Sequence, residues 1–406
     1  MSCDTTAIVD WLADGARSVA DAKSLVAELC DRLLGSGIAV SRVGVFILTL
    51  HPQIMGRRYL WEPGAPVDVS EAPFEAFETE DFRHSPVRRV VDSGVAVRRR
   101  LEEVNCPTDV TVVHELRLEG ATDYLATPLF FTDGSVHGAT WTTRQPGGFT
   151  DAQIAGLDAI MASLTRMIEI LTLRQLASSF LDIYVGNQGG SRILSGQIRR
   201  GHTKTINATI WLSDMRGFTS LSDRLPPQKL IDLINGFFDC QVPAILERGG
   251  EVLKFMGDGL LAIFPIAGDH AETCRVCEAT LAAALEARAT VATRLGSPGD
   301  HGVEGVRFGL ALHVGQVMYG NIGGGNRLDF TCIGPAVNLA ARIEKLCGGL
   351  GRTILASDAF ARHCSPTKFV NVGKFALSGV EARQTVFGFD DEDVQQNTVG
   401  ASISRP

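Results

Sequence analysis

The sequence contains no long apolar run. Among its 406 residues, no stretch approaches the roughly 18 to 20 uninterrupted apolar residues that a membrane span requires, so we expect no membrane segment. The first 15 residues carry Asp4, Asp10 and Asp14 and lack the basic start and apolar stretch of a secretory signal. We therefore expect a cytoplasmic protein.

Ordered cysteine spacing is also missing. The nine cysteines follow no repeated pattern, which in a cytosolic chain favours buried thiols over a disulfide framework. Cys274 and Cys277 form the only Cys-x-x-Cys, in an alanine-rich stretch that is typical of a helix. Because no second pair completes a zinc site, we expect no structural metal at this pair.

An excess of positive charge is absent. The formal net charge is −8, which argues against broad nucleic-acid binding because that activity needs a basic face. Hydrophobic residues make up 45% of the chain and charged residues 21%, as in ordinary globular proteins. A chain of this length exceeds what one hydrophobic core usually organises, so we expect two domains and a connector.

The first part of the chain has a mixed α/β pattern. Apolar residues recur at helical spacing over residues 8–34, and residues 40–50 predict a buried strand. A helix is expected over residues 85–91, and strands over 124–131 and 135–142 are joined by a turn containing Asp133-Gly134. This order resembles a GAF-type sensory domain over residues 1–150. The resemblance, which rests on pattern alone, implies an α/β fold and an unknown small-molecule effector.

A helix with a regular apolar period follows. The period alternates strictly between three and four residues, which is typical of a two-stranded coiled coil; a plain amphipathic helix packed on its own domain is the alternative. Five glycines within residues 184–201 predict a glycine-rich connector between the domains. Residues 151–204 are therefore interpreted as a signalling helix and a glycine-rich connector. The periodic residues are Ile154, Leu157, Met161, Leu164, Ile168 and Leu171.

Two aspartates in the second half occupy positions suited to chemistry. A predicted strand over residues 205–212 leads directly to Asp214, and predicted strands over 252–255 and 260–264 flank a turn that carries Asp258. An Asp-Gly turn alone is more often a turn signal than a metal site. Both acids, however, are expected to be rigidly held and exposed.

Three segments, residues 211–219, 254–259 and 334–342, together resemble the class III adenylate and guanylate cyclases in order and separation. The resemblance covers residues 205–390 and implies an α+β domain with a ferredoxin-like βαββαβ core. It also implies a homodimer, since in that family two catalytic domains face head to tail and form two composite sites. The polar tail, residues 391–406, is predicted to be disordered.

The resemblance assigns roles to particular residues. Asp214 and Asp258 would hold two Mg²⁺ or Mn²⁺ ions, which prefer hard oxygen ligands. Asn338 and Arg342, four residues apart on one helix face, would come from the partner chain to orient the ribose and stabilise charge on the transferring phosphorus. The turn that would bind the triphosphate comprises Gly217, Phe218 and Thr219.

Base choice depends on two further positions. The Lys254 ammonium can only donate hydrogen bonds, so it suits N1 of adenine and opposes the N1–H of guanine; Thr331, at the second position, is permissive. One departure is Ser378, where the family usually places a basic residue for the triphosphate. We expect an adenylate cyclase acting on ATP under control of the amino-terminal domain. The alternatives are a guanylate cyclase and a catalytically silent cyclase-like module.

Overall fold

The computed structural model divides the chain into two compact units, Met1–Phe180 and Leu181–Pro406. It describes residues 4–49, 51–52, 54–107, 110–296, 305–325 and 327–389. The predicted disordered tail, residues 391–406, lies outside the described residues. No helix within these ranges is both long enough and apolar enough to cross a membrane.

The first unit is built on a six-stranded antiparallel sheet with the order β3-β2-β1-β6-β5-β4. Strand β1 and the β5–β6 hairpin confirm the strands predicted over residues 40–50, 124–131 and 135–142. The strands are β1 Arg42–Leu48, β2 Gly56–Trp61, β3 Asp68–Ala72, β4 Val97–Arg100, β5 Asp123–Phe130 and β6 Val136–Thr143.

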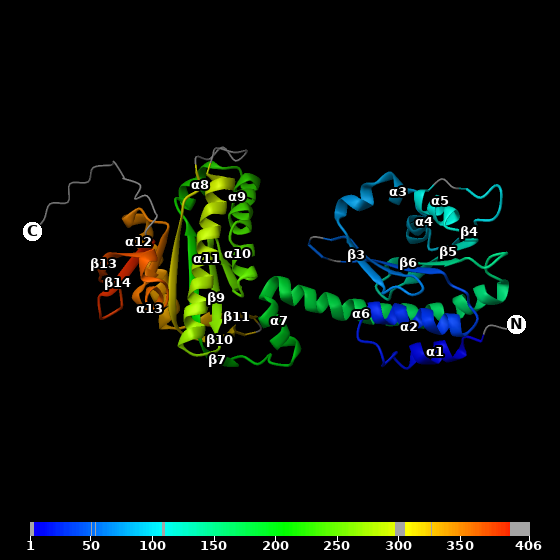
Figure 1. Cartoon of the computed structure of the whole chain (residues 1–406), viewed down its shortest axis with the longest axis horizontal. Coiled ribbons are helices and arrows are strands. Elements are labelled where there is room, and N and C mark those ends of the chain that lie inside the picture. The colour runs from blue at the N-terminus through cyan, green and yellow to red at the C-terminus, as the bar shows by residue number, and fades with distance from the viewer. Residues whose placement is uncertain are drawn as a thin grey trace, which may run out of the picture. The chain divides into compact units, whose positions relative to one another are not determined.

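Helices cover both faces of this sheet (Figure 1). The main core, with Leu29, Trp61, Trp141 and Leu157, lies between the sheet and helices α1, α2 and α6, and a smaller core lies under α4 and α5. The periodic stretch over residues 8–34 forms two helices, since Asp21 caps a new helix with its side chain. The bounds are α1 Thr6–Ala13, α2 Ala22–Gly35, η1 Phe74–Glu78, α3 Glu80–Arg83, α4 Pro86–Ser93, α5 Thr111–Leu118 and α6 Asp151–Val185.

The apolar stripe of α6 does not form the coiled-coil seam that its period favoured. Leu157, Leu164, Ile168 and Leu171 are buried in the core of the first unit, and Ile154 with Met161 packs against the same core. The alternative interpretation, an amphipathic helix packed on its own domain, therefore describes this stretch. The physical reason is that apolar residues spaced three and four apart can pack against any apolar surface, and here that surface is the sheet of the first unit.

The glycine-rich connector contains a helix. Residues Asn187–Leu194 form this helix, α7, which the sequence analysis did not predict. A Cβ on Gly189 would lie 2.8 Å from the Phe330 ring, and a Cβ on Gly190 would lie 3.1 Å from Cβ of Leu181. These glycines permit close packing instead of loosening the chain.

The second unit contains the expected ferredoxin-like core. Its strands β7, β8, β9 and β10 lie in the order β10-β7-β9-β8, which is the 4-1-3-2 order of a βαββαβ fold. The α+β class and the core topology predicted from the sequence are confirmed. The core elements are β7 Thr203–Met215, α8 Phe218–Arg224, α9 Pro227–Asp239, α10 Val242–Glu247, β8 Glu251–Met256, β9 Gly259–Ile266, α11 His270–Leu295 and β10 Phe308–Gly324.

Further elements extend this core. Strand β11 pairs with β10 as a hairpin, and β12 runs parallel to β10 and carries β14 and β13 beyond it. Along β7, Trp211 faces the core under α9 to α11, whereas Ile210 and Leu212 face α12. The added elements are β11 Arg327–Ile333, α12 Pro335–Leu350, β12 Ile354–Ser357, α13 Asp358–Ala361, η2 Pro366–Lys368, β13 Phe369–Phe375 and β14 Gln384–Phe389.

Candidate active site

Asp214 and Asp258 lie side by side at one end of the central sheet. Asp214 is the penultimate residue of β7, and its register partner on β9 is Gly259, which directly follows Asp258. A Cβ on Gly259 would lie only 3.1 Å from Oδ1 of Asp214, so glycine leaves room for the carboxylate. Both aspartates are half-buried. The structure thus brings together the two acids that the sequence placed 44 positions apart (258 minus 214).

The two carboxyl groups perturb each other. Burial, and next the negative charge of Asp258, raise the pKa of Asp214 to about 6, and Arg216 opposes this shift. Burial also raises the pKa of Asp258, which shares a hydrogen bond with Asp214. Two carboxylates this close favour sharing a proton, unless a cation takes its place. Their oxygens form a donor set suited to Mg²⁺ or Mn²⁺.

A buried ion pair connects this end of β7 to α12. Arg216 Nη2 lies 2.7 Å from Glu344 Oε1 and donates to the Glu344 backbone carbonyl at 2.8 Å. Any side chain on Gly309 would collide with this pair, because a Cβ there would lie 2.1 Å from Arg216 Nη2. Sequence reasoning did not single out Arg216 and Glu344 as a pair. The only available signal was an arginine two residues after a candidate metal ligand.

The predicted triphosphate turn follows β7 directly. Gly217 has a left-handed φ of +73° and precedes α8, which begins at Phe218 and has no side-chain cap. Gly217 and Thr219 are exposed and Phe218 is half-buried. The turn therefore presents backbone N–H groups next to the carboxylate pair, as backbone anion sites do.

The candidate base-reading residues lie on β8 and β11. Lys254 Nζ is 2.5 Å from Asp329 Oδ2, and Thr331 lies two residues further along the same strand, with a 9% exposed side chain. Positions two apart on a strand share a face. Asp329 was not among the residues that sequence reasoning selected, although its acidic side chain in the arm before Thr331 was a signal.

Asn338 and Arg342 lie one turn apart on α12. Asn338 is exposed and Arg342 is half-buried, and neither side chain makes a hydrogen bond to another described residue. The Arg342 guanidinium lies against Gly379, whose Cβ would be 3.0 Å from Arg342 Nη2. Ser378 precedes this glycine and is exposed, as is Lys374 on β13. The departure at position 378 is therefore a neighbour of Arg342.

Residues 202–389 match the family described as the adenylate and guanylate cyclase catalytic domain. These residues are a class III cyclase catalytic domain. The cyclase domain is 32% identical over 168 residues to an adenylate cyclase of Anabaena cylindrica, covering 41% of this chain and 33% of that protein. It is 29% identical over 175 residues to adenylate cyclase 1 of Rhizobium meliloti, covering 42% and 25%.

Solved cyclases resemble about half of this chain. The adenylyl cyclase CyaB from P. aeruginosa is 24% identical with a TM-score of 0.40, over 47% of this chain and 97% of that one. The guanylyl cyclase Cya2 is 25% identical with a TM-score of 0.39, over 48% and 97%. This chain spans at most a third of the length of the curated relatives named above.

Proposed function

We propose that this protein is an adenylate cyclase that converts ATP to 3′,5′-cyclic AMP and pyrophosphate. The observation that carries the proposal is the pair of half-buried carboxylates, Asp214 and Asp258, next to the open turn at Gly217. A domain that acted only as a scaffold would have no physical need for two adjacent acids at the cost of their mutual repulsion.

The carboxylate pair fits two divalent cations. Bound Mg²⁺ or Mn²⁺ would supply positive charge at the attacking 3′-hydroxyl and at the triphosphate oxygens. Asp214, near the end of β7, and Asp258, in the turn before β9, would hold these ions. Backbone N–H groups of residues 217–219 bind phosphate oxygens beside them, and the Arg216–Glu344 pair fixes the end of β7 against α12.

Asn338 and Arg342 would act on the site of a partner chain. Both side chains are free to bind a ligand, and Arg342 would stabilise negative charge on the transferring phosphorus, a contribution typically worth about 10² to 10³ in rate. A homodimer is supported by Met318 and Ile333, two exposed apolar side chains that are register partners on strands β10 and β11, since exposed apolar surface can mark an interface.

Lys254 favours adenine. In the free chain Asp329 holds its ammonium at 2.5 Å, which orients a donor toward the ring nitrogen N1 of adenine while Asp329 remains an acceptor for an amino group. Guanine presents an N1–H donor to the same ammonium, which is unfavourable. Thr331, on the same face of β11, can donate or accept and does not decide between the bases.

The effector would bind in the first unit. A cavity of about 520 Å³ lies between the sheet and helices α3 to α5, with apolar walls such as Phe46, Leu60 and Val87, and this volume suits a small ligand. Arg42 and Arg58 also line it, but each is ion-paired: Arg42 Nε lies 3.3 Å from Glu62 Oε1, and Arg58 Nη2 lies 3.2 Å from Asp68 Oδ2. A mainly apolar ligand matches these walls.

A direct assay tests the proposed activity. Purified full-length protein is given ATP or GTP with Mg²⁺ or Mn²⁺, beside the variants Asp258→Ala and Asp223→Ala, the latter removing an exposed acid on α8. We expect cyclic AMP from the wild type and from Asp223→Ala, and none from Asp258→Ala. Predominant cyclic GMP would favour the guanylate cyclase. Absence of both products, with and without ligands of the first unit, would favour the silent module.

A further inference from the structure

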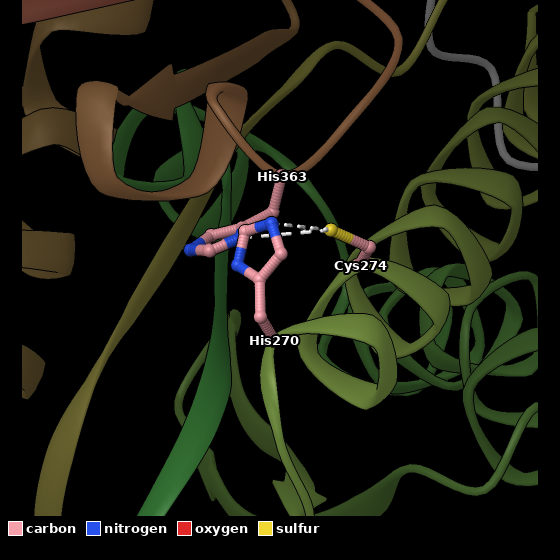
Figure 2. A group of neighbouring side chains, drawn as sticks. All are labelled: His270, Cys274 and His363. Carbon is pink, nitrogen blue, oxygen red and sulfur yellow. Dashed lines mark hydrogen bonds between the residues drawn. The ribbon is translucent and has the colours of Figure 1, made fainter.

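Two histidines and one cysteine converge on the second unit, away from the carboxylate pair. His270 is the first residue of α11, Cys274 lies one turn later on the same helix, and His363 follows α13. Figure 2 shows ring nitrogens of both histidines facing the Cys274 sulfur. His270 is exposed and the other two side chains are half-buried, so ions can reach the cluster from solvent.

The distances match those of a metal centre. Cys274 Sγ lies 3.6 Å from His270 Nε2 and 3.7 Å from His363 Nδ1, and the three ligand atoms all lie within 4.8 Å of one another. For zinc bonds of about 2.3 Å to sulfur and 2.0 Å to nitrogen at a tetrahedral angle, the sulfur–nitrogen separation is roughly 3.5 Å. The two sulfur–nitrogen distances lie within a few tenths of an ångström of this value, and the two ring nitrogens, within 4.8 Å of each other, would approach one another when an ion binds.

Thiol–imidazole hydrogen bonding explains the convergence less well. A thiol has one proton, so it can donate to only one of the two rings, and sulfur is a weak acceptor for the other. A cation placed between the three atoms satisfies all of them. We propose that His270, Cys274 and His363 bind one transition-metal ion of the Zn²⁺ class, with water in the fourth position.

The donor set separates this site from the catalytic one. One thiolate and two imidazoles favour Zn²⁺, Cu²⁺ or Ni²⁺ over Mg²⁺, whereas Asp214 and Asp258 offer only hard oxygens. Strand β9, eight residues long, runs between Asp258 and the segment before His270, and at about 3.3 Å per residue it spans roughly 26 Å. The proposed ion thus cannot be one of the catalytic pair.

Binding would join two elements that are distant in sequence. Cys274 and His363 are 89 residues apart, so an ion here ties the first turn of α11 to the segment after α13. Metal binding requires the Cys274 thiol to lose its proton, and it stabilises the folded protein because the unfolded chain has no preformed site. The ion would thus act as a cross-link between the start of α11 and the segment after α13.

Cobalt gives a readout that is specific for sulfur ligation. The full-length protein, with excess Mg²⁺ to occupy carboxylates, is titrated with Co²⁺ while thiolate-to-cobalt charge-transfer absorption is recorded; Zn²⁺ is then added to displace the cobalt. We expect saturation at one Co²⁺ per chain, loss of the band on adding Zn²⁺, and a rise in the midpoint of thermal unfolding with Zn²⁺.

Matched variants decide the ligands. His270→Ala alters an exposed residue that the core does not need, so it should fold and lose at least the roughly 10- to 100-fold in affinity that loss of an outer-shell partner costs. Cys274→Ser should abolish the band. His114→Ala, at an exposed histidine of α5, and Cys277→Ala, the other sulfur of the Cys-x-x-Cys, should bind as the wild type does. The proposal is overturned by a missing band in the wild type, by unchanged affinity in His270→Ala, or by equal loss in Cys277→Ala.

Discussion

Lys254 is the residue on which the proposed choice of base rests. It is about as exposed as its partner Asp329, at 43% and 44%, so their ion pair adds little to the free energy of unfolding. In the proposed site its value lies in orientation, because the carboxylate of Asp329 on β11 holds the ammonium on β8. Thr331 lies two residues after Asp329 on the same strand.

Reversing this charge should reverse the preference. We expect Lys254→Glu to lower kcat/KM for ATP by about 10² or more, since an acceptor then opposes N1 of adenine, and to raise GTP turnover relative to ATP. The measurement is kcat/KM for both nucleotides, with Lys204→Glu on the first part of β7 as a charge-matched control. An unchanged ATP-to-GTP ratio in Lys254→Glu would remove Lys254 from the base pocket.

The carboxylate pair predicts a pH-dependent effect of Mg²⁺. Because the pKa of Asp214 is raised from 3.8 to about 6, the metal-free folded protein binds a proton more readily than the unfolded chain. This contribution to stability is complete below about pH 4 and is lost as the pH rises through 6. Mg²⁺ should therefore raise the midpoint of thermal unfolding more at about pH 8 than at about pH 5, where protons compete with it. Scanning calorimetry with and without Mg²⁺ measures this, and Asp214→Asn should flatten the difference.

Position 378 should limit ATP affinity. Ser378 lies next to Gly379, against which Arg342 packs, and a serine gives the triphosphate no positive charge. We expect Ser378→Lys to lower the KM for ATP by about threefold to tenfold, or about 0.7 to 1.4 kcal/mol, which is the usual net contribution of one hydrogen bond. Ser365→Lys, at a distant exposed serine, serves as the control. A KM that stays the same or rises would mean that another group, such as Lys374, already fills this role.

Helix α6 shows that apolar periodicity alone does not determine what a helix packs against. Its residues from Ile154 to Leu171 are used by the core of the first unit, yet the helix continues to Val185. Ile170 and Leu173, 44% and 57% exposed, and the exposed Ala177 continue a three-four spacing on another face. If the chains pair through a coiled coil, we propose this displaced face as the seam.

A charge on this face should weaken the dimer. We expect Leu173→Asp to raise the dimer dissociation constant at least about tenfold, or about 1.4 kcal/mol, since pairing would bury a carboxylate. Arg174→Asp introduces the same residue one position away, off the seam, and should have a smaller effect. Analytical ultracentrifugation of the wild type and both variants measures the dissociation constants. Equal dissociation constants would show that α6 does not contribute the seam.

At the scale of the whole molecule, regulation requires that the first unit influence the second. The cavity of the first unit offers a way to test this without knowing the ligand. Ser70 on the edge strand β3 lines the cavity, so Ser70→Trp should fill part of it. We expect cyclase activity to change by about fivefold or more, within the usual range of allosteric coupling.

Val69→Trp provides the matched control, because Val69 is the exposed neighbour on the same strand and does not line the cavity. Its activity should equal that of the wild type. Equal activity of both variants and the wild type, over a range of protein concentrations, would indicate that the cavity is not coupled to catalysis.

The sequence by itself determined the features that depend on neighbouring residues. Local patterns predicted the strand that leads to Asp214 and the turn that carries Asp258, and the family resemblance implied the ferredoxin-like order of the core. The structure has the same strand, turn and order. The roles of Asn338, Arg342 and Thr331 follow from the family resemblance and stay predictions.

Only the tertiary structure decided which distant residues meet. Lys254 and Asp329 are 75 residues apart, Cys274 and His363 are 89 apart, and Arg216 and Glu344 are 128 apart. Tertiary packing also decided that the apolar residues of α6 lie in the core of the first unit and that part of the glycine-rich stretch forms helix α7. Local patterns state that a side chain needs a partner, but the folded sheet and its helices determine which side chain becomes that partner.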